Sequence, residues 1–544
     1  MKTHERLKPK AHDAWISFGA LLLSWSIFLV LLRYVWPYTG ITEGEALSGA
    51  AAYAWIHQIP NMMAVPYIHF LGRDIPAMFN IHHGPWGIYF LTPFVALGGC
   101  TLATLRFYSA FMFFFALWGT WRLAILLGGG KMAAFLSAFL LAVCPAMVMT
   151  RSTLITAPDV AASVWALCFA ASFARTRKPA YAYAAVAAFS VGLCTRAWVA
   201  GLGAGLLLCL ALTWRRARAL LPESRAEKTR FIGGCLACAG IFLLPAITYN
   251  AGNGWPTFKF LSSHLINRWS FVCNSLPHQN CSNLYYWTNL KASISQLAML
   301  CDGDEYSVLS REPWHWLYVL PLLLSFFYAA RDVWRRRTLW SVPAMLWIVV
   351  IGYVLVSAIT PTGEYMVHLT PLAPLLCALM FSWMAALPAG TAYRTTIPVL
   401  ALLCLAQFAG DFHLLNRRNI DLDKLGQYDE SPLLIEACRW AASRPRTPIV
   451  SMSYPFSLAA PYFSRNQARL ILWRYGGWPS DKVPWRFWLV RKDRPLFLIE
   501  SNQLGLSQVA ALKAAAKKFG IPMVPVKVFA DSSGRPAFEL YQAQ

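Results

Sequence analysis

The sequence predicts a polytopic α-helical membrane protein, with about eleven transmembrane helices, that ends in a soluble α/β domain. The chain has 544 residues, of which 57% are hydrophobic and only 13% are charged, whereas soluble domains contain about 45–50% apolar and about 25% charged residues. Its mean hydropathy is +0.44. The apolar residues gather in runs that are long enough to cross a hydrocarbon core about 30 Å thick. A soluble globule, a disordered chain and a secreted disulfide scaffold are therefore excluded.

The charge distribution predicts the orientation of these helices. The chain carries 48 Lys and Arg against 25 Asp and Glu, a net charge of +23, and basic residues in short loops keep those loops in the cytoplasm. The charge therefore indicates membrane topology, and no nucleic-acid partner is expected. If residues 85–99 form an interfacial helix that does not cross the bilayer, the N-terminus and the later basic clusters all lie in the cytoplasm. These clusters are Arg122 with Lys131, residues 175–178, residues 215–218, residues 331–337 and Arg394.

This topology predicts eleven spans and assigns each connection to one side of the membrane. Loops 39–105, 150–159 and 249–313, together with the turn at Arg196, face outward. The expected spans are residues 15–37, 106–127, 132–149, 160–174, 180–195, 197–214, 231–248, 314–330, 340–358, 367–386 and 396–411.

The last 130 or so residues change in composition, so the chain divides into a membrane domain, 1–411, and a soluble domain, 412–544, on the outer face. Helical patterns occur at 432–443 and 507–519, the second ending at Gly520. Short β-like runs separate them at 448–453, 469–473, 487–490, 495–500, 524–529 and 537–541. The pattern predicts an α/β fold.

Acidic side chains gather at the outer ends of the spans and are nearly absent within them. Glu43 and Glu45 follow the first helix, where a carboxylate can act as a general base or hold a cation. The structural alternative is that they favour a helix N-terminus through its dipole. Asp159 follows Pro158 at the expected start of another helix, where helix capping is likewise the structural alternative.

A pair of histidines precedes the expected interfacial helix. His82 and His83 are followed by Gly84 and Pro85, and imidazoles at such a place can bind phosphate or metal or carry protons. The alternative is a purely interfacial belt with the neighbouring aromatic residues.

Six short polar segments follow one another along about the first 375 residues. They are Glu43-Gly44-Glu45, His83-Gly84-Pro85, Arg151 with Ala157-Pro158-Asp159, Leu193-Cys194-Thr195-Arg196, Phe260 with His264 and Arg268, and Tyr365 with His368, Pro371 and Pro374. In order and in place, these segments resemble the motifs of the GT-C superfamily of membrane glycosyltransferases, in the branch of the aminoarabinose (lipid A) transferases and the protein O-mannosyltransferases.

The resemblance implies a sugar donor carried on a polyprenyl phosphate and an acceptor that is a lipid, a glycan or a protein. It also implies a multi-pass protein of the bacterial inner membrane whose active site and C-terminal domain face the periplasm. His83, Arg196 and Arg268 would bind the donor phosphate, Glu43 or Glu45 would deprotonate the acceptor for inverting attack, and Asp159 would position the acceptor or hold a cation. His82, Arg151, His264, Tyr365 and His368 are further active-site candidates.

Some members of the superfamily use a divalent metal, and His82, His83, His264 and the carboxylates could supply ligands. The spacing does not demand a metal, and no other cofactor is expected. An oxidising outer compartment would permit a disulfide between Cys273 and Cys281, with Cys301 as a competing partner.

Two other functions remain open for the sequence. A transporter or flippase of lipid-linked sugars would need polar groups along a path through the bilayer, and the near absence of acids in the spans counts against it. A ligase that uses a diphosphate donor would place its catalytic loop late in the chain, whereas here the acidic loop follows the first helix.

Overall fold

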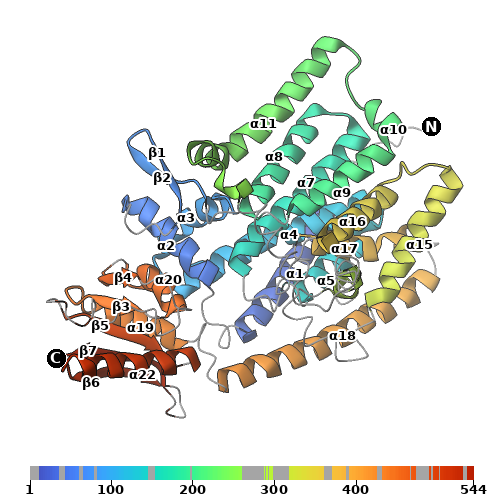
Figure 1. Cartoon of the computed structure of the whole chain (residues 1–544). Helices are drawn as coiled ribbons and strands as arrows, with labels where there is room; N and C mark the ends of the chain where they lie inside the picture. Colours follow the sequence, from blue (N-terminus) through green and yellow to red (C-terminus); the bar gives the residue numbers. More distant parts are fainter. Residues whose placement is uncertain are drawn as a thin grey trace, which may run out of the picture. The chain divides into compact units, whose positions relative to one another are not determined.

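The structure is a computed structural model, and it divides the chain into two compact units (Figure 1). The helical unit comprises Met1–Val35, Asn80–Trp86 and Ser109–Leu415, and the mixed unit comprises Trp36–Phe79, Gly87–Tyr108 and Asn416–Gln544. The structure describes residues 11–544 except 36–42, 60–64, 79–82, 145–152 apart from Met147, 197–198, most of 260–317, 360–370, 387–390, 425–431, most of 473–493 and a few single positions.

Among the described residues, helical segments overlap each of the eleven stretches that the sequence predicts to be spans. Local sequence signals set several ends: Ser224 accepts a hydrogen bond from N of Glu227 at 3.1 Å, and Pro179 occupies the first turn of its helix. The helices are α1 (Ala11–Val35), α4 (Leu102–Leu126), α5 (Gly130–Val143), α7 (Thr153–Thr176), α8 (Pro179–Thr195), α9 (Val199–Leu212), α10 (Trp214–Arg218), α11 (Arg225–Gly252), α15 (Val319–Arg336), α16 (Val342–Ile359), α17 (Ala373–Met380), the 3₁₀ helix η3 (Ser382–Ala386) and α18 (Thr391–Lys424).

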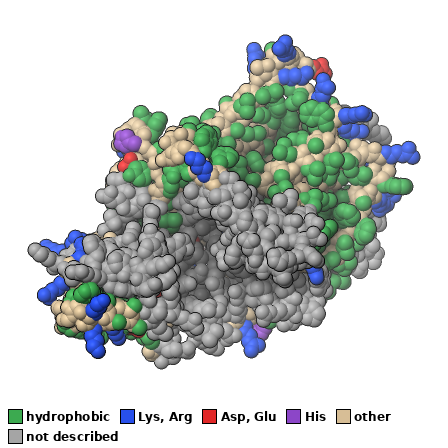
Figure 2. Space-filling model, viewed as in Figure 1, with side chains coloured by type: hydrophobic (Ala, Val, Ile, Leu, Met, Phe, Trp, Pro, Cys, Tyr) green, Lys and Arg blue, Asp and Glu red, His purple; other side chains and the backbone are tan. Residues whose placement is uncertain are grey.

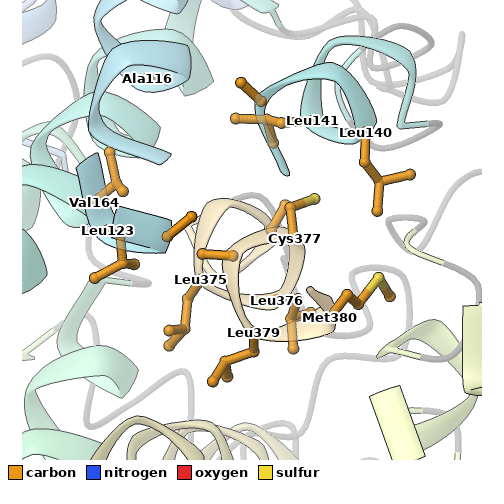
Figure 3. Close-up of a cluster of buried hydrophobic side chains, with 14 of the residues drawn as sticks. Ala116, Leu123, Leu140, Leu141, Val164, Leu375, Leu376, Cys377, Leu379 and Met380 are labelled. Atoms are coloured by element: carbon orange, nitrogen blue, oxygen red, sulfur yellow. The ribbon is translucent and has the colours of Figure 1, made fainter. Parts of the chain in front are cut away.

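Helix α17 forms the centre of the helical unit's core. Every residue from Ala373 to Met380 is buried, which is the pattern of a helix that is apolar on all sides. Figure 3 shows its side chains surrounded by those of neighbouring helices, including Leu123 of α4, Leu141 of α5 and Val164 of α7. The sequence predicts one long span over 367–386, whereas the structure has a helix of eight residues followed by a 3₁₀ turn in its place.

The helical unit also exposes much apolar surface. By length and composition, two described helices are suited to crossing a membrane, α4 and α11. Only 6% of the most apolar 18-residue stretch of α11 is buried, and its Leu236, Ile241 and Leu244 side chains are exposed. Figure 2 shows a broad hydrophobic surface with Lys and Arg side chains gathered at its edge. Such a surface is typical of contact with lipid.

In the mixed unit, the C-terminal part of the chain forms a five-stranded sheet of order β4-β3-β5-β7-β6. Strands β3 (Ile449–Ser451), β4 (Leu470–Leu472) and β5 (Leu496–Glu500) pair in parallel, whereas β6 (Met523–Ala530) and β7 (Pro536–Ala543) are antiparallel. Helices α19 (Pro432–Ala442), α20 (Tyr454–Phe463) and α22 (Gln503–Lys518) accompany the sheet. The predicted α/β pattern of the tail is therefore present.

Two details of the tail differ from the prediction. Helix α20 is not foreseen, although Ser453 caps it by accepting from N of Phe456 at 3.3 Å and Pro455 lies in its first turn. Leu489, in a run predicted to be a strand, lies in a helix. Gly520 ends α22 as predicted, with a φ of +66° that few other residues adopt.

The mixed unit also takes in segments of the first predicted outer loop. These are α2 (Glu43–His57), the hairpin of β1 (Tyr67–Phe70) and β2 (Arg73–Pro76), and most of α3 (Trp86–Gly98). Tyr462 of α20 joins them to the tail. Its ring packs so closely on Gly49 that a Cβ there would lie only 2.7 Å from it, and its hydroxyl donates to O of Thr101 at 3.0 Å. The compact units thus differ from a division of the chain at residue 411.

Candidate functional site

A buried carboxylate and a buried guanidinium of the helical unit face one another. Asp159 of α7 is fully buried, and Nη1 of Arg196 lies 3.9 Å from its Oδ2. The sequence predicts an outer loop over 150–159 with Pro158 in the first turn of the next helix. Helix α7 instead begins at Thr153, so Pro158 lies inside it and Asp159 is not a capping residue. A proline this near the N-terminus disturbs few helical hydrogen bonds.

Arg196 occupies the point where α8 ends. Its backbone turns to an extended conformation, with φ −150° and ψ 125°, while its N–H still donates to O of Gly192 at 2.8 Å. The side chain is 9% exposed. Its Nε and Nη1 atoms have no hydrogen-bond partner among the residues that the structure describes. A buried guanidinium with donors to spare suits an anionic group such as a phosphate.

The predicted His-Gly-Pro motif packs against this end of α8. A Cβ on Gly84 would lie 2.3 Å from the carbonyl oxygen of Cys194 and 2.9 Å from its Sγ, so only glycine fits there. His83 beside it is buried. The following Trp86 donates from Nε1 to O of Phe242 in α11 at 2.7 Å, three residues before the Pro245 that lies inside that helix. Segments that are far apart in the sequence therefore meet at Arg196.

Replacing Gly84 with alanine is expected to lower the stability of the helical unit by about 1–3 kcal/mol, since the methyl group would collide with backbone. The melting temperature of the purified protein measures this effect. Gly233→Ala is the matched control, because a Cβ there meets nothing within 4 Å. Equal melting temperatures for the two variants would contradict the close packing of Gly84.

The mixed unit holds a second buried ion pair. Nη1 of Arg106 lies 2.8 Å from Oε1 of Glu45, and the two side chains are 2% and 0% exposed. Arg106 is absent from the sequence-based candidates. The signal that could have found it is an arginine at the edge of an apolar run, where a cation requires a partner.

Tyr462 lies in the electrostatic field of this pair. Burial raises the pKa of its hydroxyl above the usual value, and the nearby Cys100 and Glu45 raise it further. The hydroxyl therefore stays protonated and keeps donating to O of Thr101. This contact holds α20 of the tail to the start of α4 within the mixed unit.

The other sequence-based candidates lie outside the described residues. Glu43 is the first residue of α2, but its side chain is not among those described. Six further candidates lie wholly outside the described residues: His82, Arg151, His264, Arg268, Tyr365 and His368. The two cysteines of the predicted disulfide, Cys273 and Cys281, also lie outside them. Among the residues that are described, no three His, Cys, Asp or Glu side chains gather as a metal site would require.

Residues 82–232 match the family model described as dolichyl-phosphate-mannose-protein mannosyltransferase. This segment contains His83, Asp159 and Arg196. It covers a little over a quarter of the chain. The comparison with curated proteins finds no match.

Solved structures match nearly the whole chain. ArnT from Cupriavidus metallidurans bound to undecaprenyl phosphate aligns with a TM-score of 0.57 at 13% identity, over 96% of this chain and 98% of the other. Its apo state gives 0.58 at 12% identity, over 98% of each chain. The oligosaccharyltransferase AglB from Archaeoglobus fulgidus, in complex with an inhibitory peptide and a dolichol-phosphate, gives 0.51 at 13% identity, over 95% and 70%. The chain therefore has the fold of GT-C membrane glycosyltransferases, which confirms the resemblance inferred from its motifs.

Proposed function

We propose that this protein transfers a sugar from a polyprenyl-phosphate donor to a hydroxyl or phosphate of a lipid, glycan or protein acceptor. The observation that carries the proposal is the buried Arg196 beside Asp159, whose Nε and Nη1 atoms have no hydrogen-bond partner among the described residues. This arrangement lies within the segment that matches a mannosyltransferase family model. ArnT, which has a similar fold, is described bound to undecaprenyl phosphate.

In this proposal Arg196 binds the donor phosphate. A guanidinium presents a planar fork that matches two phosphate oxygens. Asp159 is a positioning residue. Its carboxylate oxygen lies 3.9 Å from Nη1 of Arg196, close enough to orient the guanidinium by charge but too far to accept a hydrogen bond from that atom. His83, which neighbours this end of α8 through Gly84, and Arg268 complete the phosphate-binding set.

The general base in this proposal is Glu43. Glu45 is already engaged by Arg106, and a carboxylate whose charge is compensated in this way is a weaker proton acceptor.

The reaction is a single displacement at the anomeric carbon. Glu43 accepts the proton of the acceptor hydroxyl as its oxygen forms the new bond to the sugar, with inversion. The bond from the anomeric carbon to the phosphate oxygen breaks, and the lipid phosphate leaves with the electron pair. Such a donor stays in the membrane through its tail, which is consistent with the exposed apolar surface of the helical unit. We place the reaction at the periplasmic face of the bacterial inner membrane, as the basic loops predict.

Replacing Arg196 with glutamine is expected to raise the KM for the donor about 10–100-fold, because charge-assisted hydrogen bonds are worth about 1.5–3 kcal/mol. The assay follows release of polyprenyl phosphate from purified protein with a panel of polyprenyl-phosphate sugars, and the anomeric configuration of the product tests inversion. Arg230→Gln, an exposed substitution on α11, is the control. Movement of the donor across vesicles without any transfer would overturn the proposal in favour of a flippase.

A further inference from the structure

Helices α9 and α16 pack unusually closely. A Cβ on Gly205 would lie 2.3 Å from O of Val349, and a Cβ on Gly201 would lie 3.0 Å from the ring of Tyr353. Rising residue numbers in α9 therefore meet falling numbers in α16, so the helices are antiparallel. This packing brings the end of α9 beside the start of α16.

A cavity of about 380 Å³ opens where these ends meet. Its lining comes from the end of α9 and the start of α10, and from the turn between α15 and α16 (Figure 1). The residues that give it its chemical character are Thr213, Trp214, Arg215, Arg216, Thr338 and Trp340. The hydroxyl of Thr338 accepts from N of Trp340 at 3.1 Å and keeps its own proton to donate.

The charge at this cavity is positive and largely uncompensated. Arg215 and Arg216 are exposed, and the described residues place no carboxylate within ion-pair distance of either. The neighbouring turn adds exposed arginines at 335 and 337. Its Asp332 is already paired with Arg336, with Nε of the arginine 2.6 Å from Oδ1. Among the described residues, no carboxylate therefore competes with an anion for an ion pair with Arg215 or Arg216.

The surface leading to the cavity is apolar. Leu207 and Leu210, one turn apart on α9, are exposed, and they form a surface along which acyl chains can lie. Trp214, 58% exposed, lines the cavity together with the two arginines. Tryptophan favours the level of lipid headgroups, with basic residues just beyond it.

We propose that this cavity is a binding site for an anionic phospholipid, with the headgroup phosphate held by Arg215 and Arg216 and the acyl chains lying along α9. The inference does not depend on the reaction of the protein. A basic cavity at the end of packed apolar helices suits a negatively charged headgroup, whereas a zwitterionic headgroup brings its own cation to the arginines. On the topology predicted from the basic loops, the lipid belongs to the cytoplasmic leaflet.

Native mass spectrometry of the full-length protein in a neutral detergent tests this site, with titration of phosphatidylglycerol or phosphatidylcholine. The double variant Arg215→Gln, Arg216→Gln is expected to lose affinity for phosphatidylglycerol by at least about tenfold, with little change for phosphatidylcholine. The matched control is Arg225→Gln, Arg230→Gln, which removes two exposed charges from α11 outside the cavity. The melting temperature verifies that each variant is folded.

Two outcomes would overturn the proposal. If both double variants lose affinity equally, the binding depends on diffuse surface charge, and no lipid site exists at this cavity. If inorganic phosphate displaces phosphatidylglycerol at millimolar concentration, the arginines bind a free anion and the acyl chains contribute nothing. Retention of wild-type affinity by the Arg215, Arg216 variant would equally exclude the site.

Discussion

Replacing Glu43 with glutamine is expected to lower kcat about 10²–10⁴-fold and to leave the melting temperature unchanged. The amide has nearly the shape of the carboxylate but cannot accept the acceptor's proton, and a positioned general base contributes about this factor. The measurement is single-turnover transfer by the purified protein at saturating donor. Binding of the donor, measured separately by displacement with polyprenyl phosphate, is expected to persist, because the proposed phosphate ligand is Arg196.

Glu45→Gln is the matched control for this prediction. It makes the same chemical change two positions away, at a side chain that is fully buried and 2.8 Å from Arg106. Its expected effect is a lower melting temperature, since it removes one partner of a buried ion pair. If Glu45→Gln abolished transfer at an unchanged melting temperature while Glu43→Gln remained active, the base would be Glu45.

Replacing Arg106 with methionine is expected to lower the free energy of unfolding by about 3–5 kcal/mol, because Glu45 then stays buried without its counter-charge. Thermal unfolding of the purified protein, compared with that of the wild type, measures the loss. Methionine keeps much of the length of the arginine side chain, so the change of charge dominates the change of packing.

The double variant Glu45→Gln, Arg106→Met separates charge from shape. With both charges gone, neither member of the pair leaves the other buried without its counter-charge, and much of the lost stability is expected to return. If the two single effects simply added in the double variant, the pair would not be coupled. Its position between α2 and the first turns of α4 would then contribute through packing alone.

The helices of this protein could be predicted because each signal is local. Runs of apolar residues set their places, and Gly520 sets the end of α22. The observed helix ends differ from the predicted ones where several local signals compete. Pro158 suggested a helix start at 160, yet the preceding residues already have helical conformation from Thr153.

The candidate site could be predicted only in part. The motifs at His83, Asp159 and Arg196 were visible as polar residues at the ends of apolar runs, and the structure brings all three segments together in the helical unit. Arg106 was not foreseen, because nothing near it in the sequence indicates that its partner is Glu45. Whether the remaining candidates in the outer loops belong to the site stays a prediction.

By itself the sequence determined the fold class, the order of the apolar helices among the described residues and the α/β character of the tail. These properties depend on composition and on periodicity over a few turns, which neighbouring residues decide. Only the tertiary structure decided that Glu45 is engaged by Arg106, that Gly84 packs on Cys194, and that eight residues of α17 form the centre of a core. Those facts depend on which distant surfaces pack together, because a close contact or a buried charge is stabilised only by partners that the chain brings from elsewhere.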